Sequence, residues 1–308
     1  TAIGFEALQT NTTGAQNTGI GAYALDANTT GIENTSVGYN SLTDNTTGDN
    51  NTAVGKNALM DNTEADANTA VGFDALKLNT TASNNTAVGA YALDNNTTGD
   101  SNAAVGRAAL DSNTTGDNNT AVGRQALQGN TTGASNTAVG KDSASAITTG
   151  SNNTCLGHQA GTSSAPGNVV TSSNNICLGN NSVTDAFIKV DWTVTSDKRD
   201  KTDITAFTHG LSWINKLNPV TYRWDNRSDY ANGTPDGSKK GSRLNLGLIA
   251  QDELEIEKEH GYGDSTDNTL VTHIDDGGTY GMQYTKLVPI LINAVKELSA
   301  KVTALEAT

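Results

Sequence analysis

The first 157 residues alternate short apolar and polar runs with a fixed period of 17 residues. A phrase ending in glycine returns at Gly4, Gly21, Gly38, Gly55, Gly72, Gly89, Gly106, Gly123, Gly140 and Gly157. A leucine follows four residues later in eight successive copies, from Leu8 to Leu127. A period without insertion or deletion predicts identical coils stacked along one axis.

Each repeat predicts extended segments and a turn rather than a helix. In the copy that begins at Asn51, Thr-Ala-Val-Gly predicts a short strand, and the residues that end in Ala-Leu predict a second. The following Asn-Thr-Thr-Gly-x-Asn pattern is typical of a turn. Glycine, threonine and asparagine interrupt every helical run before it reaches the mean helix length of about 11 residues. The pattern therefore predicts a mainly β fold, a parallel β-solenoid (β-helix) or β-roll with coils about 4.8 Å apart.

The small number of apolar residues per coil predicts association between chains. Each coil offers about one Val, one Leu and one or two Ala to an interior. Burial of large side chains at roughly 1.5–3 kcal/mol each does not offset the ordering of a whole coil at about 1–2 kcal/mol per residue. Three chains that pool such faces around a common axis bury more, so we predict a homotrimer.

The composition changes near residue 190, which predicts two domains, 1–195 and 196–308. The first carries 16 acidic and 6 basic residues, a net charge of −10, and the second 17 and 13, a net charge of −4. Neither half has the net basic charge of a nucleic-acid binder. No run of about 20 apolar residues predicts a membrane span. Because Thr1 falls inside a repeat, we expect further chain upstream.

The repeats suggest little other chemistry. Acidic residues in turns, such as Asp49, Asp100 and Asp117, do not form the Gly-Gly-x-Gly-x-Asp pattern of calcium-binding coils, and we interpret them as solvated turns. Cys155 and Cys177 occupy matching phrases and are expected to be small core residues, within disulfide range if their coils stack. We expect neither a metal nor a cofactor.

The last residues predict a coiled-coil helix over 289–306. Apolar residues return at alternating intervals of four and three, which is the pattern of a coiled-coil seam and is compatible with a trimer. The alternative is an amphipathic helix packed on its own domain. The predicted seam consists of Val288, Leu291, Val295, Leu298, Val302 and Leu305.

Two stretches resemble known families. The phrase Asn-(Thr/Ser)-x-(Val/Ile)-Gly resembles the head repeats of trimeric autotransporter adhesins, which implies a trimeric left-handed parallel β-roll, although those repeats are usually a few residues shorter. The stretch Ser196–Ile204 resembles the opening motif of the peptidase S74 family, the intramolecular chaperone of phage tail spikes and tail fibres. The agreement continues through Leu217–Trp224, Leu246–Asp252 and Tyr284–Pro289.

The second resemblance implies a chaperone that promotes trimerisation and then cuts itself off by means of a Ser-Lys dyad. Ser196 would be the nucleophile, Lys201 its base, and the bond between Thr195 and Ser196 the cleavage site. A serine hydroxyl needs a base to remove its proton, and a lysine serves only where burial or nearby cations lower its pKa. Lys198 and Arg199 could supply such cations. Asp197 and Asp200 would oppose them if they paired with Lys201.

These patterns together predict the distal part of a homotrimeric phage tail fibre or tail spike, located in the virion tail. Residues 1–195 would be a shaft or adhesive tip that meets a host cell-surface receptor, either glycan or protein. Residues 196–308 would be a self-cleaving chaperone, a single-turnover autoprotease with no external substrate. The alternatives are a bacterial trimeric surface adhesin, and a structural fibre in which Ser196 and Lys201 are retained but idle.

Overall fold

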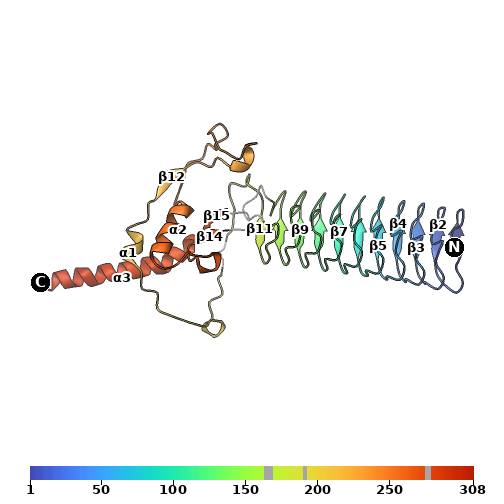
Figure 1. Ribbon diagram of the computed structural model, residues 1–308, viewed down its shortest axis with the longest axis horizontal. Coiled ribbons are helices and arrows are strands. Elements are labelled where there is room, and N and C mark those ends of the chain that lie inside the picture. Colours follow the sequence, from blue (N-terminus) through green and yellow to red (C-terminus); the bar gives the residue numbers. More distant parts are fainter. Residues whose placement is uncertain (163–168, 190–192, 275–278) are drawn as a thin grey trace. The chain divides into compact units, whose positions relative to one another are not determined.

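The computed structural model describes residues 1–162, 169–189, 193–274 and 279–308. The chain forms two compact units, Thr1–Thr184 and Asp185–Thr308 (Figure 1). The predicted boundary between residues 195 and 196 marks the expected cleavage site rather than a change in packing, and it stays a prediction.

The first unit is a parallel β-solenoid, as the period predicts. Within the described residues, one short strand from each coil joins a single 11-stranded parallel sheet in chain order. Neighbouring strands are offset by one repeat, so that Thr52 lies opposite Thr69, whereas Thr154 lies opposite Ile176 because the last coil is longer. The strands are β1 (Ala2–Ile3), β2 (Thr18–Ile20), β3 (Thr35–Val37), β4 (Thr52–Val54), β5 (Thr69–Val71), β6 (Thr86–Val88), β7 (Ala103–Val105), β8 (Thr120–Val122), β9 (Thr137–Val139), β10 (Thr154–Leu156) and β11 (Ile176–Leu178).

The second extended segment expected in each coil is wrong. The residues after the glycine form turns, in which Asn57 and Leu59 have φ angles of 56° and 51°. This left-handed conformation costs an L-residue about 1–2 kcal/mol, but it turns the Leu59 side chain into the coil, where it is fully buried. Hydrogen bonds between coils continue through the turn, since Leu59 N donates to the carbonyl of Ala75 at 3.0 Å.

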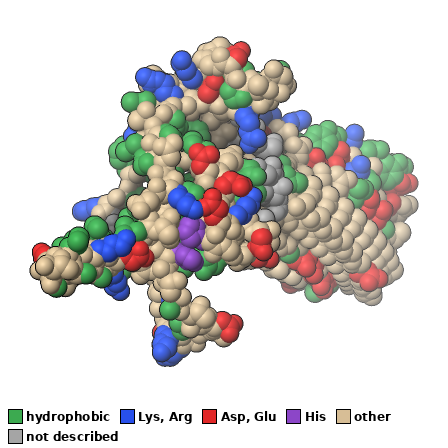
Figure 2. Space-filling model, turned by 60° about the vertical axis from the view of Figure 1, so that its left-hand side comes forward, with side chains coloured by type: hydrophobic (Ala, Val, Ile, Leu, Met, Phe, Trp, Pro, Cys, Tyr) green, Lys and Arg blue, Asp and Glu red, His purple; other side chains and the backbone are tan. Residues whose placement is uncertain are grey.

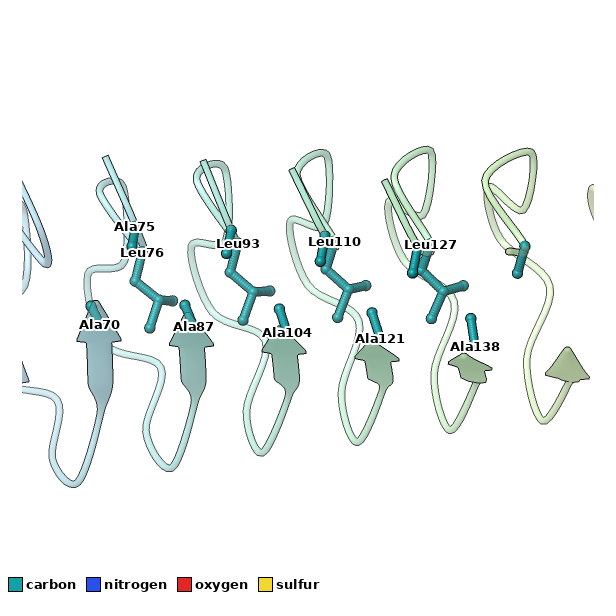
Figure 3. Packing of buried hydrophobic residues seen from close by; sticks show 14 of the residues in the cluster. Ala70, Ala75, Leu76, Ala87, Leu93, Ala104, Leu110, Ala121, Leu127 and Ala138 are labelled. Atoms are coloured by element: carbon teal, nitrogen blue, oxygen red, sulfur yellow. The ribbon is translucent and has the colours of Figure 1, made fainter. Parts of the chain in front are cut away.

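Each coil encloses its own apolar core, which corrects the expectation that three chains must pool their faces to form one. Ala53, Ala58 and Leu59 are all fully buried in the single chain. Figure 3 shows the repeated alanines and leucines in columns along the solenoid. Val54, which was expected inside, points outward and is 36% exposed. Side chains alternate along a strand, so a three-residue strand whose central alanine faces inward must turn its valine out.

Buried asparagines add two hydrogen-bonded ladders to this core. In the first ladder, Asn79 Nδ2 donates to Asn62 Oδ1 at 3.0 Å and to the carbonyl of Ala82 at 2.8 Å. The ladder ends at Asn130, whose Oδ1 is buried without a partner, because the next position carries Ile147 in place of an amide. In the second ladder, Asn51 N donates to Asn34 Oδ1 at 2.9 Å. Satisfied buried amides stabilise the stack where apolar side chains are few.

The repeating glycine is required by the close approach of adjacent coils. Gly55 has a φ of +137°, and a Cβ there would lie 2.3 Å from the carbonyl oxygen of Gly72 in the next coil. The acidic turn residues also have a structural part: Asp66 Oδ1 accepts a hydrogen bond from Asp49 N at 2.7 Å. These carboxylates thus cap backbone donors of the preceding coil rather than being solvated only.

The second unit is a small α+β assembly. Its described elements are the 3₁₀ helix η1 (Lys198–Asp200), α1 (Leu211–Ile214), β12 (Val220–Tyr222), η2 (Arg227–Asp229), β13 (Asn245–Gly247), α2 (Ala250–Glu259), η3 (Thr266–Asn268), β14 (Thr272–Ile274), β15 (Tyr280–Met282), η4 (Tyr284–Lys286) and α3 (Leu287–Glu306). β12 pairs with β13 and β14 with β15, both antiparallel. Its core contains Trp213, Ile256, Val271 and Ile290.

Helix α3 packs on this core through its first half only. Ile290 and Ala294 are buried, and Asn293 Nδ2 donates to the carbonyl of Phe207 at 2.7 Å. Glu297 Oε2 accepts a hydrogen bond from Leu211 N at 3.0 Å, which satisfies a free donor at the start of α1. The predicted helix over 289–306 lies within α3, and Pro289 stands in its first turn, where proline is tolerated.

Candidate functional site

A tight turn brings Ser196 and Lys201 together. The chain reverses through η1, and Asp197 caps this helix by accepting a hydrogen bond from Arg199 N at 2.9 Å. On the far side of the turn, Lys201 Nζ donates to Ser196 Oγ at 2.5 Å and lies 3.5 Å from the Ser196 carbonyl oxygen. The two residues to which sequence similarity assigns the dyad are therefore in direct contact.

The acidic residues of the turn do not neutralise Lys201. Asp197 forms its ion pair with Arg199, at 2.6 Å between Oδ2 and Nη2. This pairing holds the pKa of the Asp197 carboxyl below its usual range and raises the pKa of the Arg199 guanidinium. Within the part of the chain that the structure describes, no ion pair reaches Lys201. Arg199 thus offsets the charge of Asp197, and the expected opposition from that residue is absent.

Both members of the contact are exposed in the single chain, as is Thr195 on the other side of the predicted cleavage site. A lysine becomes a general base when a low-dielectric site or a neighbouring cation disfavours its charged form. The geometry therefore supplies the alignment of nucleophile and base, while the single chain leaves them in water.

The six residues of the predicted seam lie on the face of α3 that the rest of the unit leaves uncovered. Each is between 45% and 73% exposed, whereas Ile290 and Ala294, which face the core of the unit, are buried. The helix therefore has two adjacent apolar faces, one packed on its own unit and one exposed, and the trimer seam stays a prediction. A row of exposed Val and Leu side chains of this length is typical of an association surface.

A second cluster in this unit consists of buried polar and aromatic side chains, and no sequence motif predicts it. Trp213 Nε1 donates to Glu253 Oε1 at 2.7 Å, although the two residues are 40 positions apart. The Glu253 side chain is buried and its Oε2 has no partner. Burial, followed by the charge of Glu257, raises the pKa of Glu253 to about 7, against a smaller lowering by the Trp213 hydrogen bond.

Two histidines lie at the edge of this cluster. The His260 ring stacks on Trp213 with centroids 4.7 Å apart, and His209 meets His260 edge to face at 4.7 Å. Histidine side chains gather at one place on the surface seen in Figure 2. Neither histidine contacts Ser196 or Lys201 in the described structure, so they belong to the packing of the unit.

Cys155 and Cys177 face each other on β10 and β11 as buried thiols, without a disulfide between them. Their hydrogen bond and burial raise the pKa of the Cys155 thiol. Among the described residues, no group of three or more His, Cys, Asp or Glu side chains is arranged to hold a metal ion. In the same residues, no helix has the length and apolar character needed to cross a membrane.

The fold and the site define a parallel β-solenoid followed by a small α+β unit that contains a Ser-Lys contact. Residues 196–262 of that unit match the model of the Peptidase_S74 family, described as chaperone of endosialidase. The match begins at Ser196 and includes the turn to Lys201 and the pair of Trp213 and Glu253. The chaperone family implies trimer assembly. No curated protein and no solved structure matched the chain.

Proposed function

We propose that this chain is the distal part of a phage tail fibre or tail spike, located in the virion tail. Its second unit drives homotrimer assembly and is then released by cleavage between Thr195 and Ser196. The observation that carries the proposal is the 2.5 Å contact between Lys201 Nζ and Ser196 Oγ at the start of the chaperone match.

The surfaces left exposed by the single chain support the assembly step. In addition to the seam on α3, each described strand of the solenoid turns an apolar side chain outward, and these residues form one apolar column: Ile3, Ile20, Val37, Val54, Val71, Val88, Val105, Val122, Val139, Leu156 and Leu178. An uninterrupted row of this length is typical of a surface that another chain covers. We assign the apolar column to contacts between the three shafts.

Identical coils do not fix the register of three shafts. A slip by one whole coil places Val54 of one chain where Val71 stood and keeps nearly every contact, because the two residues occupy equivalent positions. The α3 seam has only three Val-Leu pairs, so a slip by one pair leaves a third of them without a counterpart. In this proposal, α3 sets the alignment first and the coils pair afterwards.

The cleavage step requires that assembly remove water from the turn. Ser196 Oγ then attacks the carbonyl carbon of Thr195 while Lys201 takes the hydroxyl proton, and the proton passes to the amine of Ser196 as the peptide bond breaks. Water hydrolyses the resulting ester, which leaves a carboxylate on Thr195. Because both side chains are exposed in the single chain, cleavage is expected only in the assembled trimer.

Mass spectrometry tests the cleavage. The wild-type chain of 31.8 kDa is expected to yield two fragments with a new N-terminus at Ser196, and Ser196→Ala to remain intact. Lys201→Gln is expected to abolish cleavage. Lys240→Gln is the matched control, an exposed lysine of the same unit that lies outside this turn, and it should cleave normally. A trimer by sedimentation that stays intact after long incubation would contradict the proposed cleavage and leave the non-cleaving fibre.

A further inference from the structure

Nearly all aromatic and basic side chains of the repeats stand at the two positions that follow the repeating glycine. Among residues 1–162 these positions hold all five aromatic residues, namely Phe5, Tyr23, Tyr39, Phe73 and Tyr91. They also hold four of the five basic residues, namely Lys56, Arg107, Arg124 and Lys141. Lys77 is the exception. Because every coil stacks on the next, these side chains form one strip along the solenoid, which we call the aromatic-basic strip.

The aromatic end of the strip is exposed. Phe5, Tyr39 and Phe73 are 64%, 49% and 39% exposed. Neighbouring rings meet edge to face: Phe5 and Tyr23 at 5.5 Å and 82°, Tyr23 and Tyr39 at 5.9 Å and 87°. Exposed aromatic rings on a polar, Asn- and Thr-rich surface present flat apolar contacts that a folded monomer does not need.

The basic end of the strip is held in place by one carboxylate. Asp142, largely buried, lies 3.6 Å from Arg124 Nη2, 3.2 Å from Lys141 Nζ and 4.0 Å from His158 Nε2. Arg107, one coil earlier, is exposed and forms no salt bridge among the described residues. Two permanent cations, Arg124 and Lys141, thus share one carboxylate on successive coils, which leaves an excess of positive charge around Asp142.

This end is also the least acidic part of the solenoid. Residues 1–106 carry 11 acidic and 2 basic residues, whereas residues 107–158 carry 3 of each. Figure 2 shows Lys and Arg side chains among hydrophobic ones along the upper edge of the repeat unit. An anion that approaches the acidic shaft is therefore repelled less at this stretch of the strip than elsewhere along the solenoid.

The strip does not suit the axis of a trimer. Three copies of Arg107, Arg124 and Lys141 brought together there would repel one another, while the apolar column has no charge. The strip therefore remains available at the outside of the assembly. Its side chains repeat at the coil spacing of about 4.8 Å, so its partner is a linear molecule that lies along the solenoid.

We propose that the aromatic-basic strip binds a linear polysaccharide that bears acidic groups. Arg107, Arg124 and Lys141 bind the carboxylate or sulfate groups, since guanidinium and ammonium groups form strong charge-assisted hydrogen bonds with such anions. The exposed rings pack on the apolar faces of the sugars. This inference rests on the proposed fibre role and gives its receptor a chemical class.

The arrangement favours a polysaccharide over a single-stranded nucleic acid. Nucleic-acid channels interleave cations with rings on which successive bases stack. Here the cations gather on later coils than most of the rings, and adjacent rings stand at 77–87° to each other, so they offer no series of parallel faces.

Binding of the intact chain to immobilised heparin and polygalacturonate tests the proposal, with neutral dextran and a single-stranded oligonucleotide as comparisons. We expect binding to either acidic polysaccharide that weakens with added salt, and no binding to dextran. The double variant Arg107→Gln with Arg124→Gln should lose about tenfold or more in affinity. Lys77→Gln removes a basic residue of the same solenoid outside the strip and should change the affinity less than about twofold.

A second pair of variants tests the aromatic end of the strip. Tyr39→Ala should weaken binding at high salt, where the ionic contribution is screened, whereas Phe187→Ala, an aromatic residue outside the strip that is 97% exposed, should not. Absence of binding, equal losses in the strip variants and Lys77→Gln, or equal retention of the oligonucleotide overturns the proposal. Sedimentation and mass spectrometry on the same samples report assembly and cleavage separately, so failure of the receptor inference is distinguishable from failure of the fibre proposal.

Discussion

Replacing Glu253 by glutamine is expected to stabilise the second unit at neutral and alkaline pH. The carboxyl is buried beside Trp213, its Oε2 has no partner, and a small cavity next to it is lined mainly by apolar residues such as Leu217 and Ile256. Glutamine keeps the shape and can still accept the hydrogen bond from Trp213 Nε1, but it carries no charge.

The sign and the size follow from the raised pKa of Glu253, about 7 in the folded chain against 4.5 ordinarily. The folded state binds the proton more tightly than the unfolded state does, so this group contributes its full stability below about pH 4.5. That stability is lost as the pH rises to about 7. A difference of about 2.5 pKa units corresponds to about 3 kcal/mol, so Glu253→Gln should raise the free energy of unfolding by up to about that amount at pH 8.

Urea unfolding of wild type and Glu253→Gln, measured from pH 4.5 to pH 8 by tryptophan fluorescence, gives the comparison. The difference between the two unfolding free energies should grow with pH and level off above about pH 7. Glu257→Gln is the control: the Glu257 carboxylate accepts hydrogen bonds from Leu270 N, Val271 N and Thr272 N, so its loss should destabilise the unit by about 1–3 kcal/mol. A constant difference between Glu253→Gln and wild type over this range would refute the reasoning.

Three further substitutions test the solenoid and the seam. Gly55→Ala places a Cβ against the next coil at a left-handed φ and should lower the free energy of unfolding by about 2 kcal/mol or more. Gly241→Ala, where the nearest atom to a Cβ is the Trp224 carbonyl oxygen at 3.6 Å, should unfold near wild type; equal midpoints in denaturant would contradict this. Asn79→Leu breaks its ladder on both sides and should destabilise by about 3 kcal/mol, measured by thermal unfolding; an unchanged midpoint would show that the ladder contributes little. Leu298→Glu puts charge into the exposed seam and should shift the trimer to monomer in sedimentation at micromolar concentration; a persistent trimer would exclude the seam as the association surface.

The repeat architecture was predictable because its signal is local and occurs many times. A strand of three residues, a turn and a glycine at a close approach each leave a mark within 17 positions, and ten copies make that mark unmistakable. The direction of the valines was not predicted, because a count of apolar residues does not say which face of a short strand is inside. The sequence does not show which asparagines form the buried ladders, for a related reason: a turn asparagine and a ladder asparagine look alike in sequence, and only stacking pairs the amides.

The two parts of the candidate site also differ in whether their contacts join residues that are close in sequence. Ser196 and Lys201 are five residues apart, so a single capped turn suffices to join them, and a local motif carried that information. Trp213 and Glu253 are joined only by the fold of the unit, across 40 positions, and no pattern in the sequence links them. A raised carboxyl pKa of this kind depends on the complete enclosure of one side chain, which local sequence does not encode.

The repeated coils fix their alignment within one chain but not between chains, whereas the second unit does not repeat. Within one chain, each coil is held by hydrogen bonds to its neighbours at a fixed offset of 17 residues up to β10, so one fold is specified without help. Between chains the same repetition does not specify a single alignment, because equivalent coils offer equivalent apolar surfaces at every offset. The few features that break the repeat are the longer last coil before β11 and the non-repeating unit that contains α3. Among the residues of this chain, the features that would align the proposed trimeric shaft therefore lie at its C-terminal end, and a cleavage that waits for assembly would remove this element only after it has acted.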